Sequence, residues 1–260
     1  MYQKEVLEVI QYIKGNLHDS LELNKIAKHI SYSPYHFSRL FKQETGLSPV
    51  YFVSSLRLQK AKELLMTTDL PVRDIGMEIG QQSLGTFTTR FSSSIGLTPA
   101  KFRHYARQRR ENYLEQLSHL TTWQDEVVSP RQESTAITGH IRANEPFHGV
   151  IFIGLFQKPI PEGMPIYGTL IQGTGSFTFQ GVNSGVYYLL VTALSWDSLV
   201  TDIYLPYHTL RARLKKPLIV DDSVSLKPIQ LTLRGPELDD PPILISLPLL
   251  MKRFLDRATT

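Results

Sequence analysis

The chain of 260 residues contains no cysteine. This absence excludes disulfide scaffolds, thiol nucleophiles, thiolate zinc sites and iron–sulfur clusters. Long apolar runs are also missing, because the longest stretch, from Ile243 to Met251, is too short to cross a membrane and contains Pro248. The first twenty residues carry charges throughout, unlike a signal peptide. We therefore expect a soluble, cytoplasmic protein without a membrane partner.

Signatures of catalysis and of cofactor binding are lacking as well. The sequence has no GxSxG motif, no phosphate-binding loop, no dinucleotide fingerprint and no HExxH motif. Its 8 histidines are scattered without the spacing of a metal site. We predict that the protein is not an enzyme and that it uses no cofactor and no metal ion.

Positive charge is concentrated in the first part of the chain. Residues 1–110 contain 16 Lys or Arg and 9 Asp or Glu, a balance of +7. The remaining 150 residues contain 12 and 15, a balance of −3, and the two balances sum to the net charge of +4. A basic segment beside a mildly acidic one suits a module that binds a polyanion, joined to a second domain.

The spacing of apolar residues also changes along the chain. Up to about residue 120 they recur every three or four positions, which is typical of helices. From about residue 147 strand-like runs alternate with turn residues. The pattern predicts an α plus all-β protein of two domains: an all-helical domain over residues 1–110, a helix and linker over 111–146, and an antiparallel β-sandwich over 147–260.

An internal repeat carries the main functional signal. Two blocks of sixteen residues, 37–52 and 87–102, align without a gap at an offset of 50, each with the pattern F-x-x-x-F-x-x-x-x-G-L-[ST]-P-x-x-F. Upstream segments align at an offset of 49, with one residue inserted at the turn of the second copy. Such self-similarity predicts a duplicated supersecondary unit.

Each copy has the residue order of a helix-turn-helix. Ser33 and Pro34 form a helix start, and Gly46 is suited to end that helix. Phe37, Leu40 and Phe41 define the inward face, which leaves Ser38 and Arg39 directed outward. A helix of this kind fits the major groove of DNA, whereas an ordinary helical bundle with solvated polar faces is the alternative.

On these residues the first hundred positions resemble the DNA-binding domain of the AraC/XylS family of bacterial transcription regulators. The resemblance rests on the two repeat blocks and on the intervening pattern V-R-D-I-G from Val72 to Gly76. It implies two helix-turn-helix units bridged by one long helix, here about residues 49–66. It also implies that the two recognition helices enter successive major grooves of double-stranded DNA.

The resemblance assigns base contacts position by position. In the first unit it points to Tyr35, Ser38 and Arg39, with Arg39 as the guanine-binding candidate. In the second unit the family's arginine position holds Thr89, and an arginine follows one residue later. We therefore expect the first unit to dominate base recognition. The assigned residues of the second unit are Leu84, Thr86, Thr89 and Arg90.

Phosphate contacts are expected from basic residues around the two units. For Arg57 the alternative is an ion pair inside the domain. The assigned residues are Lys42, Arg57, Arg73, Lys101 and Arg103.

The C-terminal sequence is less informative. The segment from Gly173 to Leu189 resembles a hairpin of transthyretin-like β-sandwiches found in carboxypeptidase regulatory domains. A generic antiparallel hairpin shares the same turn residues. Aromatic residues of this region are candidates for a ligand site, with the hydrophobic core as the simpler interpretation: Tyr167, Phe177, Phe179, Tyr187, Tyr188 and Trp196.

Three functions remain compatible with these patterns. The first is a DNA-binding regulator whose C-terminal domain binds a small-molecule effector or forms a homodimer. In the second, that domain docks RNA polymerase or another protein and binds no ligand. The third is a carbohydrate- or peptide-binding protein in which DNA binding has degenerated.

Overall fold

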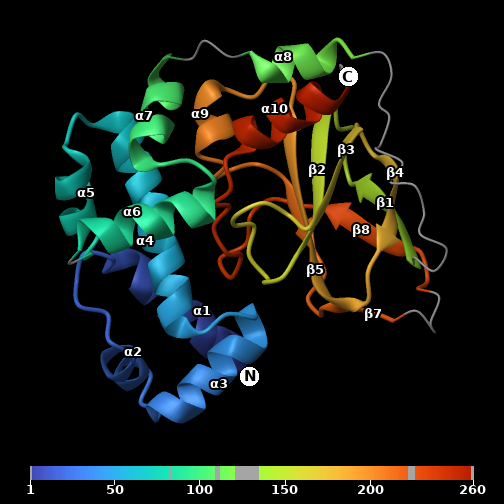
Figure 1. Ribbon diagram of the computed structural model, residues 1–260. Helices are drawn as coiled ribbons and strands as arrows, with labels where there is room; N and C mark the ends of the chain where they lie inside the picture. The colour runs from blue at the N-terminus through green and yellow to red at the C-terminus, as the bar shows by residue number, and fades with distance from the viewer. Residues whose placement is uncertain (1, 82, 109–111, 121–134, 222–225, 259–260) are drawn as a thin grey trace. The chain divides into compact units, whose positions relative to one another are not determined.

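The computed structural model describes residues 2–81, 83–108, 112–120, 135–221 and 226–258 (Figure 1). The chain divides into two compact units. The first comprises Met1–Gln108 together with Glu237–Ile245, and the second comprises Arg109–Pro236 together with Ser246–Thr260. The chain therefore leaves the first unit after Gln108 and returns to it for nine residues near its C-terminus.

In the first compact unit, the described residues 2–81 and 83–108 form helices connected by turns and loops. Its helices are α1 (Tyr2–Gly15), α2 (Leu23–His29), α3 (Pro34–Thr45), α4 (Pro49–Thr67), α5 (Val72–Glu78), α6 (Leu84–Ile95) and α7 (Pro99–Gln108). The pairs α2–α3 and α5–α6 are the two predicted helix-turn-helix units, and α4 connects them (Figure 1).

Matching caps define the two recognition helices, α3 and α6. The Ser33 hydroxyl accepts a hydrogen bond from the backbone N–H of His36, and the Ser83 hydroxyl accepts one from Thr86. Both helices end at a left-handed glycine, as the sequence predicts, with φ of 80° at Gly46 and 87° at the equivalent position of the second repeat.

The repeated phenylalanines form the core of each helix-turn-helix unit. Phe37 and Phe41 are fully buried and meet edge to face with ring centroids 5.5 Å apart. Phe87 and Phe91 repeat this contact at 5.7 Å. Edge-to-face packing of large buried rings stabilises each unit beyond its burial of apolar area.

The turn between the two helices of each unit requires one left-handed residue. That residue is Ser31 in the first helix-turn-helix, with φ of 58°, and Gly80 in the second helix-turn-helix, with φ of 75°. The two positions correspond at the offset of 49. Glycine adopts this conformation without a steric penalty, whereas Ser31 adopts it at a cost.

The second unit contains mostly antiparallel strands and three helices among its described residues. The strands are β1 (Thr135–Ala143), β2 (Gly149–Phe156), β3 (Tyr167–Gln172), β4 (Gly175–Val182), β5 (Gly185–Ser195), β6 (Arg211–Arg213), β7 (Leu218–Val220) and β8 (Ile229–Leu233). The helices are α8 (Tyr113–Ser118), α9 (Val200–Tyr204) and α10 (Leu247–Ala258).

Two open sheets enclose one hydrophobic core in this unit. One sheet has the order β4-β1-β8 and the other the order β3-β2-β5-β6, with β7 paired to β5. Residues from both sheets belong to a single buried cluster, including Ile141, Ile153 and Leu189. The alternation of apolar residues along the strands directs one face of each sheet into this core.

The prediction for the C-terminal part is confirmed in its coarser form, a region of mostly antiparallel sheets. It is wrong that all strands are antiparallel, because β1 and β8 pair in parallel. Strand β1 also lies within residues 111–146, where the sequence analysis placed a helix and linker. Part of that predicted linker, residues 121–134, lies outside the described residues.

Candidate nucleic-acid interface

Helix α3 exposes the polar face that the sequence analysis assigned to base contacts. Tyr35 is 81% exposed and Arg39 is exposed, while Ser38 between them is half-buried. The Ser33–Pro34 start fixes the first turn of the helix, so these side chains project from its N-terminal half. Within the described part of the chain, the side chain of Arg39 makes no hydrogen bond and no ion pair. Its guanidinium is available for an external acceptor.

Helix α6 presents a different surface at the matching positions. Leu84 is 48% exposed, and Thr86 and Thr89 are exposed. The guanidinium of Arg90 lies over the ring of Tyr51 on α4, 5.4 Å from the ring centroid. The structure thus places the one arginine of α6 against the bridging helix by a cation–π contact. What remains on the exposed positions of α6 is apolar or hydroxylic.

The five predicted phosphate-binding residues fall into two groups. The side chains of Lys42, Arg73 and Lys101 are exposed and make no hydrogen bond or ion pair with any described residue. Arg57 and Arg103 instead donate to backbone carbonyls of the first unit. Lys42, Arg73 and Lys101 therefore remain candidates for phosphate contacts. Arg57 and Arg103 instead form hydrogen bonds within the first compact unit.

Arg57 holds the loop that precedes the first helix-turn-helix. Its Nε donates to the carbonyl of Leu17 at 3.1 Å, and its Nη2 donates to that of Asp19 at 2.7 Å. Burial lowers the pKa of the guanidinium below its ordinary value. The internal partner that the sequence analysis considered was a carboxylate, but the acceptors are two main-chain carbonyls.

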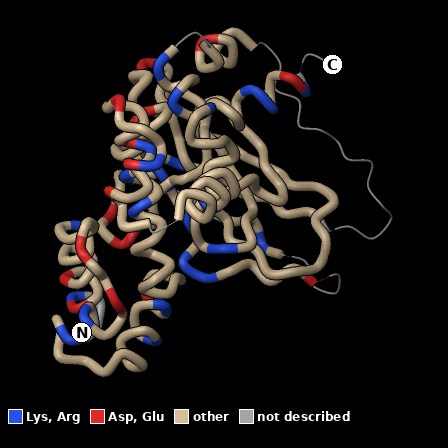
Figure 2. Tube along the Cα trace, turned by 60° about the vertical axis from the view of Figure 1, so that its left-hand side comes forward, with Lys and Arg blue, Asp and Glu red and all other residues tan. Residues whose placement is uncertain are grey.

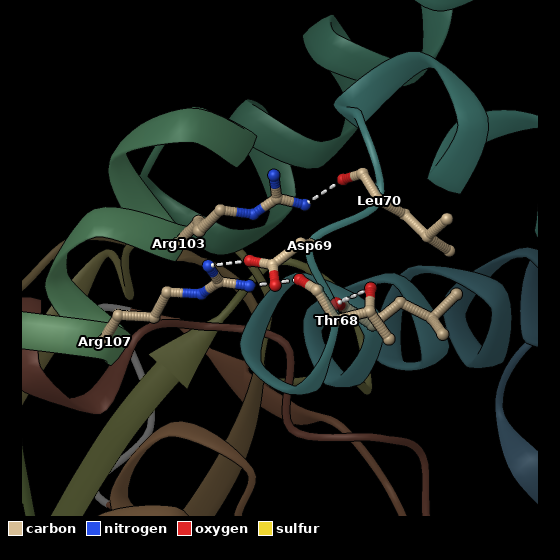
Figure 3. Close-up of polar contacts among 6 residues, drawn as sticks. Thr68, Asp69, Leu70, Arg103 and Arg107 are labelled. Carbon is tan, nitrogen blue, oxygen red and sulfur yellow. Dashed lines mark hydrogen bonds and ion pairs between the residues drawn. The ribbon is translucent and has the colours of Figure 1, made fainter.

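Arg107 repeats this arrangement at the second helix-turn-helix (Figure 3). It donates to the carbonyl of Thr68 and, at 2.5 Å, to the Oδ1 of Asp69, both in the loop that precedes α5. Arg107 follows Arg57 by 50 residues, which is the offset of the repeat. We call each of these interactions an arginine clamp. Each clamp joins the helix after a helix-turn-helix unit to the loop before it.

Arg103 adds a further bond to the second clamp. It donates to the carbonyl of Leu70, so that both arginines of α7 point toward the same loop (Figure 3). The hydrogen bond and the charge of Arg107 lower the pKa of Asp69 below its usual range. The sequence analysis missed the clamps, although the repeat offset between Arg57 and Arg107 was a usable signal.

Both Lys or Arg and Asp or Glu residues occur along the trace of the first compact unit (Figure 2). The exposed cations at particular positions, Arg39 and Lys42 on α3 together with Arg73 and Lys101, provide its candidate contacts to a polyanion.

The aromatic residues of the second unit are mostly structural. Phe177, Phe179 and Tyr187 are buried in its core, and Tyr167 packs against that core. Burial at these positions supports the core interpretation rather than the ligand site. The described residues contain no helix long and apolar enough to span a membrane, and no group of three or more potential metal ligands.

A shallow polar cavity of about 470 Å³ occupies the opposite face of sheet β4-β1-β8. His140 and Arg142 from β1, Ser176 from β4 and Gln230 from β8 contribute to its lining. The Nδ1 of His140 lies 3.1 Å from the Ser176 hydroxyl. The strand alternation that buries Ile141 in the core directs these polar side chains outward.

Comparison with known proteins places the first unit in a family. A helix-turn-helix domain model matches residues 26–105. The uncharacterized regulator YfiF of Bacillus subtilis is 44% identical over 37% of this chain and 30% of its own length. The transcriptional activator AarP of Providencia stuartii is 31% identical over 39% of this chain and 76% of its own length.

The arabinose operon regulatory protein of Escherichia coli is 34% identical over 38% of this chain and 34% of its own length. This chain spans well under half the length of the first relatives, 30% for YfiF and 39% for YobQ of B. subtilis. AarP, in contrast, is covered over most of its length. The chain belongs to the AraC/XylS family of helix-turn-helix transcription regulators.

Proposed function

We propose that the protein is a sequence-specific regulator that binds double-stranded DNA with α3 and α6 in successive major grooves. In this arrangement α3 supplies most of the base discrimination. The observation that carries the proposal is the contrast between the exposed, unpartnered Arg39 on α3 and the Thr89 that replaces it on α6. An arginine that forms two hydrogen bonds with guanine contributes about 1–3 kcal/mol of discrimination.

Helix α6 has a different contribution in this proposal. Leu84 and the methyl groups of Thr86 and Thr89 suit apolar contact with the methyl group of thymine. Such contacts are weaker than a pair of hydrogen bonds to guanine. We therefore expect the half-site of α6 to tolerate base changes and to favour A·T pairs.

The exposed cations supply the sequence-independent part of the affinity. Lys42 on α3, Arg73 on α5 and Lys101 on α7 come from both repeats and are available to phosphates. The logarithm of the binding constant falls with the logarithm of salt concentration by about 0.9 per neutralised phosphate. With these three contacts a slope of about −3 or steeper follows.

The test is selection of preferred duplexes from a random pool by the full chain, followed by affinity measurements at several salt concentrations. The proposal predicts a motif spread over two successive major grooves and a steep salt dependence. As a control, Lys216→Ala removes one exposed cation from the second unit and is expected to leave affinity unchanged. Absence of any selected motif together with a flat salt response would reject the proposal and leave ligand binding by the second unit as the function.

We also propose that the second unit binds a small polar effector in the cavity on sheet β4-β1-β8. Its donors and acceptors, among them Arg142 and Gln230, suit a ligand with several hydrogen-bonding groups. A ligand that binds only the native state stabilises it by RT ln(1 + [L]/Kd), so the melting temperature rises with ligand concentration above the dissociation constant. Screening polar metabolites by thermal shift, with Arg142→Ala as the comparison, tests this. Shifts that Arg142→Ala leaves unchanged would place the ligand elsewhere.

A further inference from the structure

Residues Glu237–Ile245 follow β8 and precede α10, yet they belong to the DNA-binding unit. We call this segment the strap. Its last three residues, Ile243, Leu244 and Ile245, are at most 2% exposed, and the two prolines before them are buried. The segment has no helix or strand, so its buried main-chain carbonyls require donors from elsewhere.

Lys62 on the bridging helix provides such donors. Its side chain is 1% exposed, and its Nζ donates to the carbonyls of Ile243 at 3.2 Å and Leu244 at 3.3 Å. The same Nζ lies 5.7 Å from the ring centroid of Phe102 on α7. One side chain therefore contacts the strap, α4 and α7 together.

A buried ammonium group is costly unless polar partners satisfy it. Burial lowers the pKa of Lys62 to about 7, while the two carbonyls and the aromatic ring favour its charged form. Without the strap, Lys62 loses both hydrogen-bond acceptors that the structure shows. The strap thus provides the polar partners that a buried lysine on this face of α4 requires.

A second lysine contacts the beginning of the strap. The Nζ of Lys14, in the last turn of α1, donates to the carbonyl of Leu238 at 3.3 Å. Asp240 closes the turn between these contacts by accepting a hydrogen bond from the backbone N–H of Glu237 at 2.8 Å. The strap therefore has contacts at both ends, to α1 and to α4.

The position of the strap relative to the recognition helices indicates its role. Helix α4 connects α3 to the second helix-turn-helix. The packing of α4 against α7 therefore sets the spacing of the two helix-turn-helix units. None of the strap contacts described above involves the exposed residues of α3 or α6. A docked strap consequently leaves the DNA-contacting surface open.

We propose that the strap is an intramolecular brace that the DNA-binding unit requires for high-affinity binding, with Lys62 as its anchor. Both ends of the strap continue into the second unit, at β8 and at α10. A rearrangement of either element transmits to the bridging helix through the strap. The inference rests on the proposed DNA-binding function and adds a route by which the second unit controls it.

The test compares Lys62→Met with Lys60→Met in the full chain. Methionine preserves most of the side-chain volume and removes the charge and the donors. Lys60 lies on the same helix and pairs with Glu63 near the surface at 2.9 Å, so its substitution makes the same charge change without touching the strap. Two quantities are measured: hydrogen exchange of the backbone amides in residues 237–245, and affinity for the selected duplex.

The brace predicts that Lys62→Met speeds exchange in the strap about tenfold or more and weakens DNA binding about tenfold, whereas Lys60→Met changes exchange little. Replacing Pro241 and Pro242 together by glycine loosens the strap without altering α4, and it should produce the same two changes. This second variant gives a test if Lys62→Met fails to fold.

The outcomes separate the brace from the proposed function. Faster strap exchange with undiminished DNA affinity contradicts the brace, as does unchanged exchange in both variants. If the wild-type chain selects no duplex, the DNA-binding function fails, and the requirement for the brace in that function fails with it. The exchange data then still show whether Lys62 anchors the strap.

Discussion

Helices α3 and α6 occupy matching places in the two repeats, yet they present different side chains. Both begin at a serine cap, end at a left-handed glycine and bury a pair of phenylalanines. On the exposed side, α3 has Arg39 and Lys42, where α6 has Thr89 and Ser92. The comparison indicates that the two helix-turn-helix repeats share the residues that fix the backbone and differ in the exposed residues that we propose as DNA contacts.

The two arginine clamps likewise occupy matching places in the repeats and differ in their partners. Arg57 and Arg107 both hold the loop before their own helix-turn-helix, but with different partners. Arg57 is half-buried and bonded to two carbonyls, whereas Arg107 is more exposed and pairs with the exposed Asp69. Equivalent positions thus perform one structural task at different depths in the fold.

The largest expected effect is on stability, at the first clamp. Arg57→Ala removes two charge-assisted hydrogen bonds and leaves two carbonyls unsatisfied, which costs about 3 kcal/mol of unfolding free energy. Arg107→Ala should cost much less, because water replaces its contacts. Chemical denaturation of both variants measures the difference. Equal losses would show that the two clamps do not differ as their burial indicates.

The next effect concerns DNA. Arg39→Ala is expected to weaken binding to the selected duplex by about 2 kcal/mol, or roughly thirtyfold, and to relax the base preference at one position. Thr89→Ala should change affinity by less than about threefold. Titration of labelled duplex with each variant measures both values. A larger loss for Thr89→Ala would reverse the assignment of the two helices.

The turns allow a third comparison. Gly80→Ala places a Cβ atom in a left-handed conformation, 3.1 Å from the Cζ of Arg57, and should destabilise the fold by about 1–2 kcal/mol. Ser31→Gly relieves the left-handed conformation at the equivalent position and should be neutral or stabilising by less than about 1 kcal/mol. Thermal unfolding monitored by circular dichroism tests both. Destabilisation by Ser31→Gly would mean that its side chain matters more than its backbone strain.

The smallest expected effect is a gain of function. Thr89→Arg places on α6 the residue that α3 carries, and it should add about 1 kcal/mol of affinity for duplexes with guanine in the second half-site. The same change at Ser93, an exposed position of α6 in the following turn, serves as the charge-matched control. Equal gains from both would identify the effect as nonspecific electrostatics.

The helical unit could be predicted from the sequence because its signals are local and duplicated. The Ser33–Pro34 start, the terminal glycines and the paired phenylalanines each determine a helix boundary or a buried face, and the repeat confirms them against one another. The exposed face of α3 followed from the same periodicity. The structure agrees with the sequence prediction where short-range rules determine the conformation.

The remaining features depend on partners distant in the chain. The acceptors of Arg57 and Lys62 are main-chain carbonyls, which have no residue signature in a sequence. The parallel pairing of β1 with β8 joins segments about 90 residues apart, and no local rule predicts it. A lysine between Ala61 and Leu65 on an otherwise buried helix face was the available sign that another segment covers α4.

The central claim is that the first helix-turn-helix supplies most of the base discrimination. The most direct measurement is the affinity of the full chain for the selected duplex and for two derivatives, each with base substitutions confined to one half-site. The account predicts a loss of about tenfold or more for substitutions opposite α3 and less than about threefold for those opposite α6. Equal losses in the two half-sites, or a larger loss opposite α6, would contradict it.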